Sequence, residues 1–252
     1  MNKTALVTGA ARNIGKGIAR SLLIDGYDCV LVDRDKAELA RVSHDFAQLG
    51  GRIHQYVADI GELKQVDKLM LWIETEGISV TELINNAGYE SESSVSKLTE
   101  GEMAKSFDVN LQGPFYLTSL VANNWIESHI QGNIIFISST HSKIIRTHPL
   151  YSASKAAIEM FMREAALEFA PYGIRINSIA PGAVQDTDQL KTDYRTPLGY
   201  YMQPQDIAEG ISFLLSNKAR FITGQSLIID GGYSLTHTHH WIKQGKLQKP
   251  GN

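Results

Sequence analysis

Tyr151 and Lys155 form a pair of side chains whose types and spacing suit proton transfer. Residues four apart share one face of an α-helix, so the ammonium group of Lys155 can lie beside the phenol of Tyr151. A nearby cation favours the ionised phenol, whose ordinary pKa is about 10. A phenol with a lowered pKa can act as an acid or a base near neutral pH. Of the 10 tyrosines, Tyr151 alone has a lysine four residues later, and the preceding apolar run ends in two hydroxyl donors, Ser138 and Ser139.

A glycine-rich turn near the N-terminus is suited to binding a diphosphate. The sequence TGAARNIGKGIA, residues 8–19, follows a short apolar run and leads into a helical pattern. Gly9 allows a sharp turn, and Gly15 falls at the first helical turn, where exposed N–H groups attract a diphosphate. The spacing differs from the G-x-G-x-x-G fingerprint, so an ordinary turn is an equal interpretation. Asn13 stands where a glycine is expected, but asparagine tolerates left-handed backbone.

Polar residues also follow the next three predicted strands. Asp33 lies about 20 residues beyond the glycine turn, where a carboxylate can bind ribose hydroxyls and repel a 2′-phosphate. Arg34 can instead hold that phosphate, so the pair favours NAD and leaves NADP open. Asp59 can bind an adenine amino group or cap the following helix. The sequence NNAG, residues 85–88, suits a backbone close to a ligand, or an Asx turn.

Alternating strand-like and helix-like segments position these residues. The predicted strands are Thr4–Thr8, Asp28–Asp33, Arg52–Val57, Glu82–Asn85, Asn133–Ser138, Arg175–Ile179 and Ser226–Ile229. The predicted helices are Ile14–Asp25, Lys36–Leu49, Glu62–Glu76, Glu100–Ser128, Tyr151–Ala170 and Gln205–Ser216. This alternation predicts an α/β fold with a doubly wound parallel sheet and helices on both faces. Ligands of such sheets bind beyond the carboxyl ends of the strands, where the polar residues above are expected.

The composition is that of a globular protein and disfavours several functions. The chain has 252 residues and a net charge of −3, so no overall field favours nucleic acid or an anionic membrane. No segment reaches the roughly 20 apolar residues of a membrane span, and the N-terminus does not resemble a signal peptide. The single cysteine, Cys29, fits a reducing compartment, and we expect a cytoplasmic protein. No linker divides the chain, which predicts one domain over residues 1–236 and a tail over residues 237–252.

Taken together, the motifs resemble the short-chain dehydrogenase/reductase family. The similarity extends from Lys3 to Leu235 and is carried, in this order, by TGAARNIG, LVDRD, ADI, NNAG, VNLQGPF, FISS, YSASKAAI, RINSIAPGAV and ITGQSLIIDGG. Each motif is weak alone, but their order and spacing are highly specific. The resemblance implies a single-domain Rossmann-like α/β/α sandwich that binds NAD(H) or NADP(H). It also implies an oligomer, commonly a homotetramer, with a homodimer as the alternative.

The resemblance assigns roles to individual residues. Tyr151 would be the catalytic acid and base, and Lys155 would lower its pKa and hold the nicotinamide ribose. Ser139, rather than its neighbour Ser138, would bond the substrate oxygen. Asn110 would hold a water for proton relay. The implied cofactor contacts are Gly9, Asn13, Ile14, Asp33, Arg34, Asp59, Ile60, Asn86, Ala87, Gly88, Tyr151, Lys155, Pro181, Gly182, Val184 and Thr187.

The sequence departs from the family pattern at two places. Asn13 replaces the middle glycine of the turn, and Asp186 displaces the usual threonine to Thr187. No metal is expected, because the tail histidines alternate in a polar segment without a nearby carboxylate: His237, His239 and His240.

The expected reaction is reversible hydride transfer between a nicotinamide cofactor and a secondary alcohol or ketone. The residues expected to face the substrate are mostly polar: Tyr89, Glu90, His141, Lys143, His148, Gln185 and Tyr194. A pocket for a steroid or a long acyl chain would be more apolar, so we expect a small sugar, polyol or keto compound. Lys143 and Arg146 are interpreted as solvated loop charges rather than as an anion site.

Two alternative functions stay open from the sequence. The first is an NADP-dependent 3-oxoacyl-type ketoreductase that uses Arg34. The second is a non-catalytic nucleotide-binding sensor or scaffold, which the set formed by Asn110, Ser139, Tyr151 and Lys155 disfavours, because a scaffold has no need for proton transfer.

Overall fold

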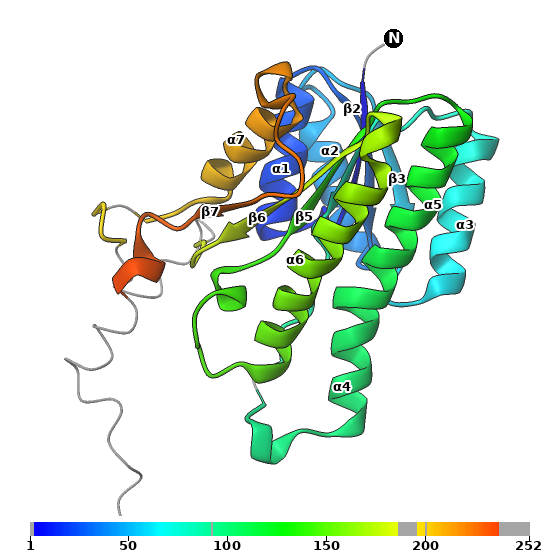
Figure 1. Ribbon diagram of the computed structural model, residues 1–252. Helices are drawn as coiled ribbons and strands as arrows, with labels where there is room; N and C mark the ends of the chain where they lie inside the picture. Colours follow the sequence, from blue (N-terminus) through cyan, green and yellow to red (C-terminus); the bar gives the residue numbers. More distant parts are fainter. Residues whose placement is uncertain (1–2, 92, 186–195, 200, 237–252) are drawn as a thin grey trace, which may run out of the picture.

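The apolar runs of the sequence form the strands of one parallel sheet (Figure 1). The computed structural model describes residues 3–91, 93–185, 196–199 and 201–236, so the predicted tail over residues 237–252 lies outside the described residues. The strands of the described part are β1 (Thr4–Thr8), β2 (Asp28–Asp33), β3 (Ile53–Val57), β4 (Glu82–Asn85), β5 (Asn133–Ile137), β6 (Arg175–Pro181) and β7 (Ser226–Ile229). Their order across the sheet is β3-β2-β1-β4-β5-β6-β7. The order reverses between β1 and β4, which creates the crevice where ligands of such sheets bind.

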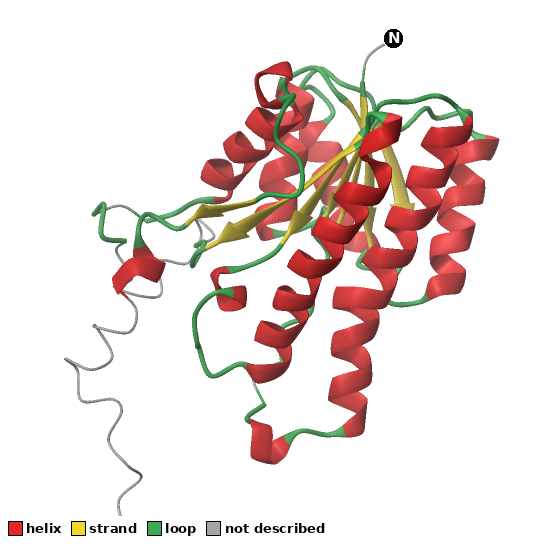
Figure 2. Cartoon of the chain, in the orientation of Figure 1, coloured by secondary structure: helices red, strands yellow, loops and turns green. Residues whose placement is uncertain are grey.

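Helices cover both faces of this sheet (Figure 2). One layer contains α1 (Asn13–Ile24), α2 (Lys36–Phe46) and α7 (Pro204–Leu215). The other layer contains α3 (Leu63–Thr75), α5 (Gly113–Glu127) and α6 (Pro149–Phe169), with α4 (Glu100–Phe107) preceding α5. This arrangement confirms the predicted Rossmann-like α/β/α sandwich. Within the described residues, no helix has the length and apolar character needed to cross a membrane.

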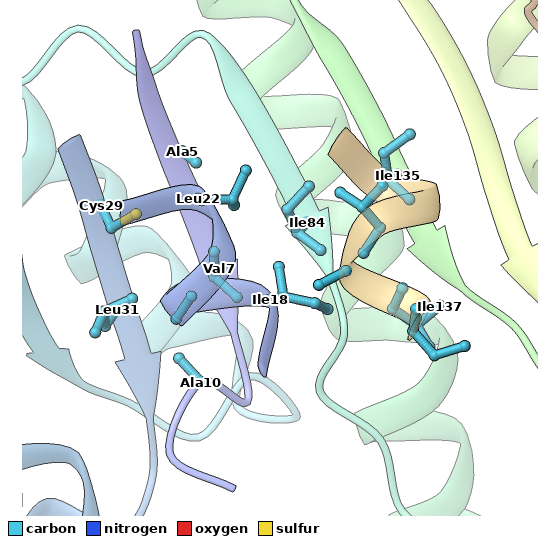
Figure 3. Close-up of a cluster of buried hydrophobic side chains, with 14 of the residues drawn as sticks. Ala5, Val7, Ala10, Ile18, Leu22, Cys29, Leu31, Ile84, Ile135 and Ile137 are labelled. Atoms are coloured by element: carbon cyan, nitrogen blue, oxygen red, sulfur yellow. The ribbon is translucent and has the colours of Figure 1, made fainter. Parts of the chain in front are cut away.

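The central strands are buried on both faces, which explains their nearly continuous apolar sequences. Alternate residues of β1 point to opposite layers: Val7 joins the core beneath α1, and Leu6 joins the core beneath α3 and α5. In Figure 3, Val7 and Leu31 lie in one cluster with Ile18 of α1. The same cluster contains Cys29, and burial raises the pKa of its thiol to about 12. Cys29 is therefore an unreactive core residue.

The predicted helix over Glu100–Ser128 contains an irregular turn. A π-helical turn, Asp108–Gln112, joins α4 to α5, and the N–H of Gly113 donates to the carbonyl of Asp108, five residues earlier. Pro114 accounts for this turn, because proline has no N–H and its ring crowds the carbonyl four residues before it. That carbonyl belongs to Asn110. The continuous helix of the prediction is therefore wrong at this turn, and π-helical turns are frequent at functional sites.

Candidate active site

The glycine turn after β1 is tightly packed against the loop after β4. Asn13 is the first residue of α1 and has a φ of 45°, in the left-handed region. A Cβ atom on Gly15 would lie 2.0 Å from the carbonyl oxygen of Gly9, so only glycine fits at this position. The Nδ2 of Asn86 donates to the carbonyls of Thr8 and Gly9, at 2.9 and 3.0 Å. These contacts fix the backbone at the start of α1, next to the crevice of the sheet.

Two acidic residues, Asp33 at the end of β2 and Asp59 after β3, line the cavity next to this turn. The carboxylate of Asp33 is fixed by two backbone groups, since it accepts the N–H of Ala11 and that of Asp35, both at 3.0 Å. The guanidinium of Arg34 lies 3.6 Å from the carboxylate of Asp59. Asp59 accepts the N–H of Gly61 at 2.9 Å.

The suggested role of Asp59 as a helix cap is wrong. The residue that precedes the first turn of α3 is Glu62, because the helix begins at Leu63. The carboxylate of Asp59 instead forms a local turn and faces the cavity shared with Asp33.

The expected cofactor contacts converge on two adjoining cavities. The cavity beside Asp33 is lined by Gly9, Asp33, Arg34, Asp59, Ile60, Ala87 and Gly88, among others. The second cavity leads from the glycine turn to the catalytic pair, and its lining includes Gly9, Asn13, Ile14, Asp33, Asn86, Ala87, Gly88, Tyr151, Lys155, Pro181 and Gly182. Val184 lines neither cavity and forms a β-bridge with Met202. Thr187 lies outside the described residues.

Tyr151 and Lys155 lie together at the far end of the second cavity. The Nζ of Lys155 is 5.3 Å from the centre of the Tyr151 ring and donates to the carbonyl of Ile137 at 2.7 Å. Burial lowers the pKa of Lys155 to about 8. At neutral pH the ammonium form therefore prevails.

The predicted lowering of the Tyr151 pKa is not found. Burial raises the pKa of this phenol, the carboxylate of Glu90 raises it further, and a hydrogen bond with Ser139 offsets only part of the rise. Burial disfavours the charged form of any acid, and it is the largest influence on this phenol. The protonated phenol is the form of Tyr151 that this structure stabilises.

The two serines after β5 have different partners. Ser139 interacts with the phenol of Tyr151 and accepts the N–H of His141 at 3.2 Å. Ser138 instead donates to a carboxylate oxygen of Glu159 at 3.0 Å. The geometry therefore favours Ser139 as the hydroxyl that faces the reacting groups. Its role in catalysis stays a prediction.

Asn110 joins the loop after β4 to the catalytic helix. It is fully buried, and its Oδ1 accepts the N–H of Tyr89 at 2.7 Å. Its Nδ2 donates to the carbonyl of Tyr89 at 2.8 Å and to the hydroxyl of Ser154 at 3.0 Å. A Cβ atom on Gly88 would lie 3.5 Å from the Asn110 Oδ1 and 3.6 Å from the Nζ of Lys155. Asn110 therefore fixes the backbone beside the catalytic lysine, and its part in proton relay stays a prediction.

Three of the expected substrate residues form a series of contacts that reaches the phenol. The ring of His141 lies 5.1 Å from the ring of Tyr151 and 5.4 Å from the ring of His148, edge to face in both pairs. The Nδ1 of His148 is 2.9 Å from a carboxylate oxygen of Glu90, without the alignment of a hydrogen bond. Glu90 lines the same cavity as Tyr151.

Other expected substrate residues have different surroundings. The ring of Tyr89 lies under the ammonium of Lys105, at 4.3 Å. Lys143 is paired with Glu159, so its interpretation as a solvated charge is wrong. The guanidinium of Arg146 lies 5.0 Å from the ring of Tyr233. Gln185 and Tyr194 are the remaining expected substrate residues. The N–H of Gln185 donates to the carbonyl of Met202 at 2.9 Å. Tyr194 lies outside the described residues.

Sequence reasoning missed Glu159, a buried carboxylate one helical turn beyond Lys155. It is 2% exposed and accepts hydrogen bonds from Ser138, Ser142 and Ser226 as well as from Lys143. Although burial raises the pKa of Glu159, the bonds from Lys143 and the serines outweigh it and hold the pKa below its ordinary value. The sequence signal that could have revealed Glu159 is its spacing of four residues from Lys155, because this spacing places both side chains on one helical face.

Replacing Glu159 with glutamine is expected to lower the free energy of unfolding by about 1–3 kcal/mol at neutral pH, because charge-assisted hydrogen bonds become neutral. A lowered carboxyl pKa stabilises the folded state above the unfolded pKa. The difference between wild type and variant should therefore shrink as the pH falls below about 4. Urea unfolding at neutral pH and below about pH 4 measures this difference in unfolding free energy. Glu164→Gln, on the exposed side of α6, is the control. Equal unfolding free energies for Glu159→Gln and wild type at neutral pH would contradict the prediction.

Comparisons with known proteins agree with this geometry. A family profile described as short chain dehydrogenase matches residues 3–197. The (S)-acetoin-forming diacetyl reductase of Staphylococcus epidermidis is 32% identical over 256 residues, which cover 92% of this chain and 98% of that protein. The L-xylulose reductase of Caenorhabditis elegans is 31% identical over 244 residues, covering 92% and 96%. The solved structure of 4-hydroxyisoleucine dehydrogenase complexed with NADH has a TM-score of 0.85 and 29% identity, covering 93% of this chain and 99% of that one. The chain belongs to the short-chain dehydrogenase/reductase family and is an oxidoreductase that interconverts secondary alcohols and ketones with a nicotinamide dinucleotide.

Proposed function

We propose that the protein is an NAD-dependent oxidoreductase of small, polar secondary alcohols and ketones. The observation that carries this proposal is the cavity that leads from the glycine turn to Tyr151, where Ser139 and Lys155 also lie. The lining of this cavity beside Tyr151 includes the carboxylate of Glu90, which His148 contacts from outside the cavity. The names of two relatives, diacetyl reductase and L-xylulose reductase, also denote small polar substrates.

The residues of the glycine turn fit a dinucleotide. Gly15 allows the backbone of α1 to approach a diphosphate, and the open first turn of the helix presents N–H groups to it. Asp33 is held by two backbone N–H groups and lines both cavities. When bound, the nicotinamide ring supplies the acceptor or donor of the hydride.

Asp33 supports NAD over NADP. A carboxylate fixed at this place repels a 2′-phosphate and accepts hydrogen bonds from ribose hydroxyls. Arg34, the residue that could hold a 2′-phosphate, has its guanidinium 3.6 Å from Asp59. This pairing reduces its availability for a phosphate.

Replacing Asp33 with asparagine is expected to lower the ratio of kcat/KM for NAD to that for NADP by about tenfold to a hundredfold. The change removes the like charge that faces a 2′-phosphate and weakens the hydrogen bonds to ribose. Initial rates with both cofactors measure the ratio, and Asp45→Asn on the surface of α2 removes an equal charge elsewhere. An unchanged ratio in Asp33→Asn would refute the assignment of cofactor preference to this residue.

The chain's own residues account for the proton transfer. In ketone reduction, the phenol of Tyr151 donates its proton to the carbonyl oxygen of the substrate, and Ser139 donates a hydrogen bond to the same oxygen. In alcohol oxidation, the phenolate accepts the proton of the alcohol. Lys155, anchored on the carbonyl of Ile137, stabilises the phenolate while it exists. Asn110 keeps the backbone beside Lys155 in place.

The test of this function is a panel of polyols, sugars, keto acids and long-chain alcohols with NAD and NADP. The absorbance of reduced nicotinamide measures turnover. We expect the highest kcat/KM for small polar compounds with NAD. Turnover of long apolar alcohols alone would overturn the proposal, and tight cofactor binding without any turnover would favour the sensor or scaffold alternative.

We also propose that residues 1–236 form one domain of a cytoplasmic homotetramer. Two groups of exposed apolar side chains support the assembly. The first group is Met103, Phe107, Met160 and Leu167 of α4 and α6, and the second is Phe213 of α7 and Ile228 of β7. Exposed apolar surfaces of this kind mark protein interfaces. Sedimentation velocity gives the oligomeric state, and a monomer at micromolar concentration would overturn this part of the proposal.

A further inference from the structure

Glu90 places a carboxylate at the substrate end of the catalytic cavity. It lies two residues after Gly88, in the loop that follows β4, and lines the cavity together with Ser139, Tyr151 and Lys155. Its side chain is 50% exposed, so the carboxylate is accessible to a ligand. Ser139 and Lys155 already have assigned roles in the proposed reaction, whereas proton transfer does not require Glu90.

The charge of Glu90 is not neutralised by a lysine or an arginine among the described residues. Two cations that precede His148, the residue that contacts Glu90, have other partners. Lys143 is paired with Glu159, and the guanidinium of Arg146 lies over the ring of Tyr233. A ligand that enters this end of the cavity therefore meets a negative group beside the catalytic pair. The same charge raises the pKa of both Tyr151 and Lys155.

A series of contacts positions this carboxylate relative to the phenol. The Nδ1 of His148 lies 2.9 Å from the Oε1 of Glu90. The ring of His148 packs edge to face on His141, and the ring of His141 packs in the same way on Tyr151. Because α6 begins at Pro149, directly after His148, the helix that carries Tyr151 also fixes the residue that contacts Glu90. The carboxylate of Glu90 and the phenol of Tyr151 are thus linked through His148 and His141.

We propose that Glu90 determines substrate specificity by accepting a hydrogen bond from a hydroxyl or ammonium group close to the reacting carbon. A carboxylate accepts hydrogen bonds and donates none, and it repels anions in a partly desolvated site. The enzyme therefore selects diols, polyols and amino alcohols, and it discriminates against hydroxy acids, keto acids and phosphate esters. This inference rests on the proposed function, because it concerns the substrate of the same reaction.

Three substrates of one carbon skeleton test the inference with NAD. Butane-2,3-diol offers a second hydroxyl, butan-2-ol offers none, and 3-hydroxybutanoate carries a carboxylate. In the wild type, we expect kcat/KM for the diol to exceed that for butan-2-ol by about tenfold to a hundredfold, as for a hydrogen bond to a charged group. The hydroxy acid should have the lowest value. In Glu90→Gln, the ratio of diol to butan-2-ol should fall by about tenfold, and kcat/KM for 3-hydroxybutanoate should rise by about tenfold.

The controls separate this inference from the proposed function. Glu74→Gln, on the exposed surface of α3, removes the same charge and should leave all three values unchanged. If the wild type oxidises butan-2-ol and the ratios stay the same in Glu90→Gln, the role of Glu90 is overturned and the proposed function stands. If the wild type oxidises no small alcohol or polyol at all, the proposed function fails, and this inference fails with it.

A second variant, Glu90→Ser, keeps the inference testable if Glu90→Gln does not fold. Glu90→Ser removes the carboxylate and shortens the side chain, and it should change the ratios in the same direction as Glu90→Gln. The dissociation constant for NAD, measured by calorimetry, should match the wild type within about twofold for both variants, since Glu90 is not one of the expected cofactor contacts. A folded Glu90→Ser protein that keeps the wild-type ratios would overturn the inference.

Discussion

Replacing Tyr151 with phenylalanine should lower kcat by about 10²- to 10⁴-fold, the range expected for loss of a positioned acid or base. The phenol lies half-buried at the end of the cavity, where it interacts with Ser139. Phenylalanine keeps the ring and its contact with His141 but has no proton to transfer. Cofactor affinity should change little, because the glycine turn and Asp33 are untouched. Steady-state rates and the dissociation constant for NAD measure the two effects.

The pH dependence of the wild type gives this experiment a second readout. Because burial and Glu90 raise the pKa of Tyr151, the protonated phenol prevails at neutral pH and suits ketone reduction. Alcohol oxidation needs the phenolate, so its rate should increase as the pH rises above neutrality, and Tyr151→Phe should lose this increase.

The exposed Tyr172 provides the matched control. Tyr172→Phe removes an identical hydroxyl outside the cavity and should leave kcat and the pH profile unchanged. Near-wild-type turnover of Tyr151→Phe would show that another group transfers the proton.

Replacing Gly15 with alanine is expected to weaken NAD binding by about a hundredfold or more. The new Cβ atom would lie 2.0 Å from the carbonyl oxygen of Gly9 and 2.5 Å from the Nδ2 of Asn86. Neither contact can be relieved by a rotamer change of the alanine, so the backbone of the turn must move. Overpacking of this kind typically costs about 1–3 kcal/mol. The backbone movement displaces the N–H groups that would hold the diphosphate. Titration of the protein with reduced nicotinamide dinucleotide, followed by fluorescence, measures the loss.

Gly101 allows a direct comparison with the same substitution. It lies in the first turn of α4, and a Cβ atom there meets nothing within 4 Å. Gly101→Ala should therefore keep the wild-type affinity, and its helix propensity should raise stability by up to about 1 kcal/mol. Equal affinities for Gly15→Ala and Gly101→Ala would mean that the turn after β1 does not bind the cofactor.

Much of the fold follows from the sequence, because the central strands are short apolar runs buried on both faces. The spacing of Tyr151 and Lys155 also correctly placed their side chains near each other, since both lie on one regular helix. The irregular turn at Asp108–Gln112 was missed, although Pro114 was visible in the sequence. Helical periodicity alone does not reveal where a proline widens a helix instead of ending it.

The electrostatics of the site required the tertiary structure. The direction of the Tyr151 pKa depends on burial and on Glu90, which is 61 residues away in the chain. The contact between Glu90 and His148, and the bonds that Ser226 and Lys143 make with Glu159, likewise join distant segments. Local patterns do not encode such contacts, because strand order and loop paths decide which side chains meet.

The π-helical turn sets the rotational phase between α4 and α5. An α-helix advances about 100° per residue, so deleting one residue from Asp108–Gln112 would rotate α4 by about that angle about the common axis. The rotation would present a different face of α4 to α6, against which it packs, and the shift in register would take Asn110 out of reach of Ser154. Loops elsewhere in the chain can change in length and leave the catalytic helix in place. In this turn, by contrast, a change of one residue in length would displace Asn110.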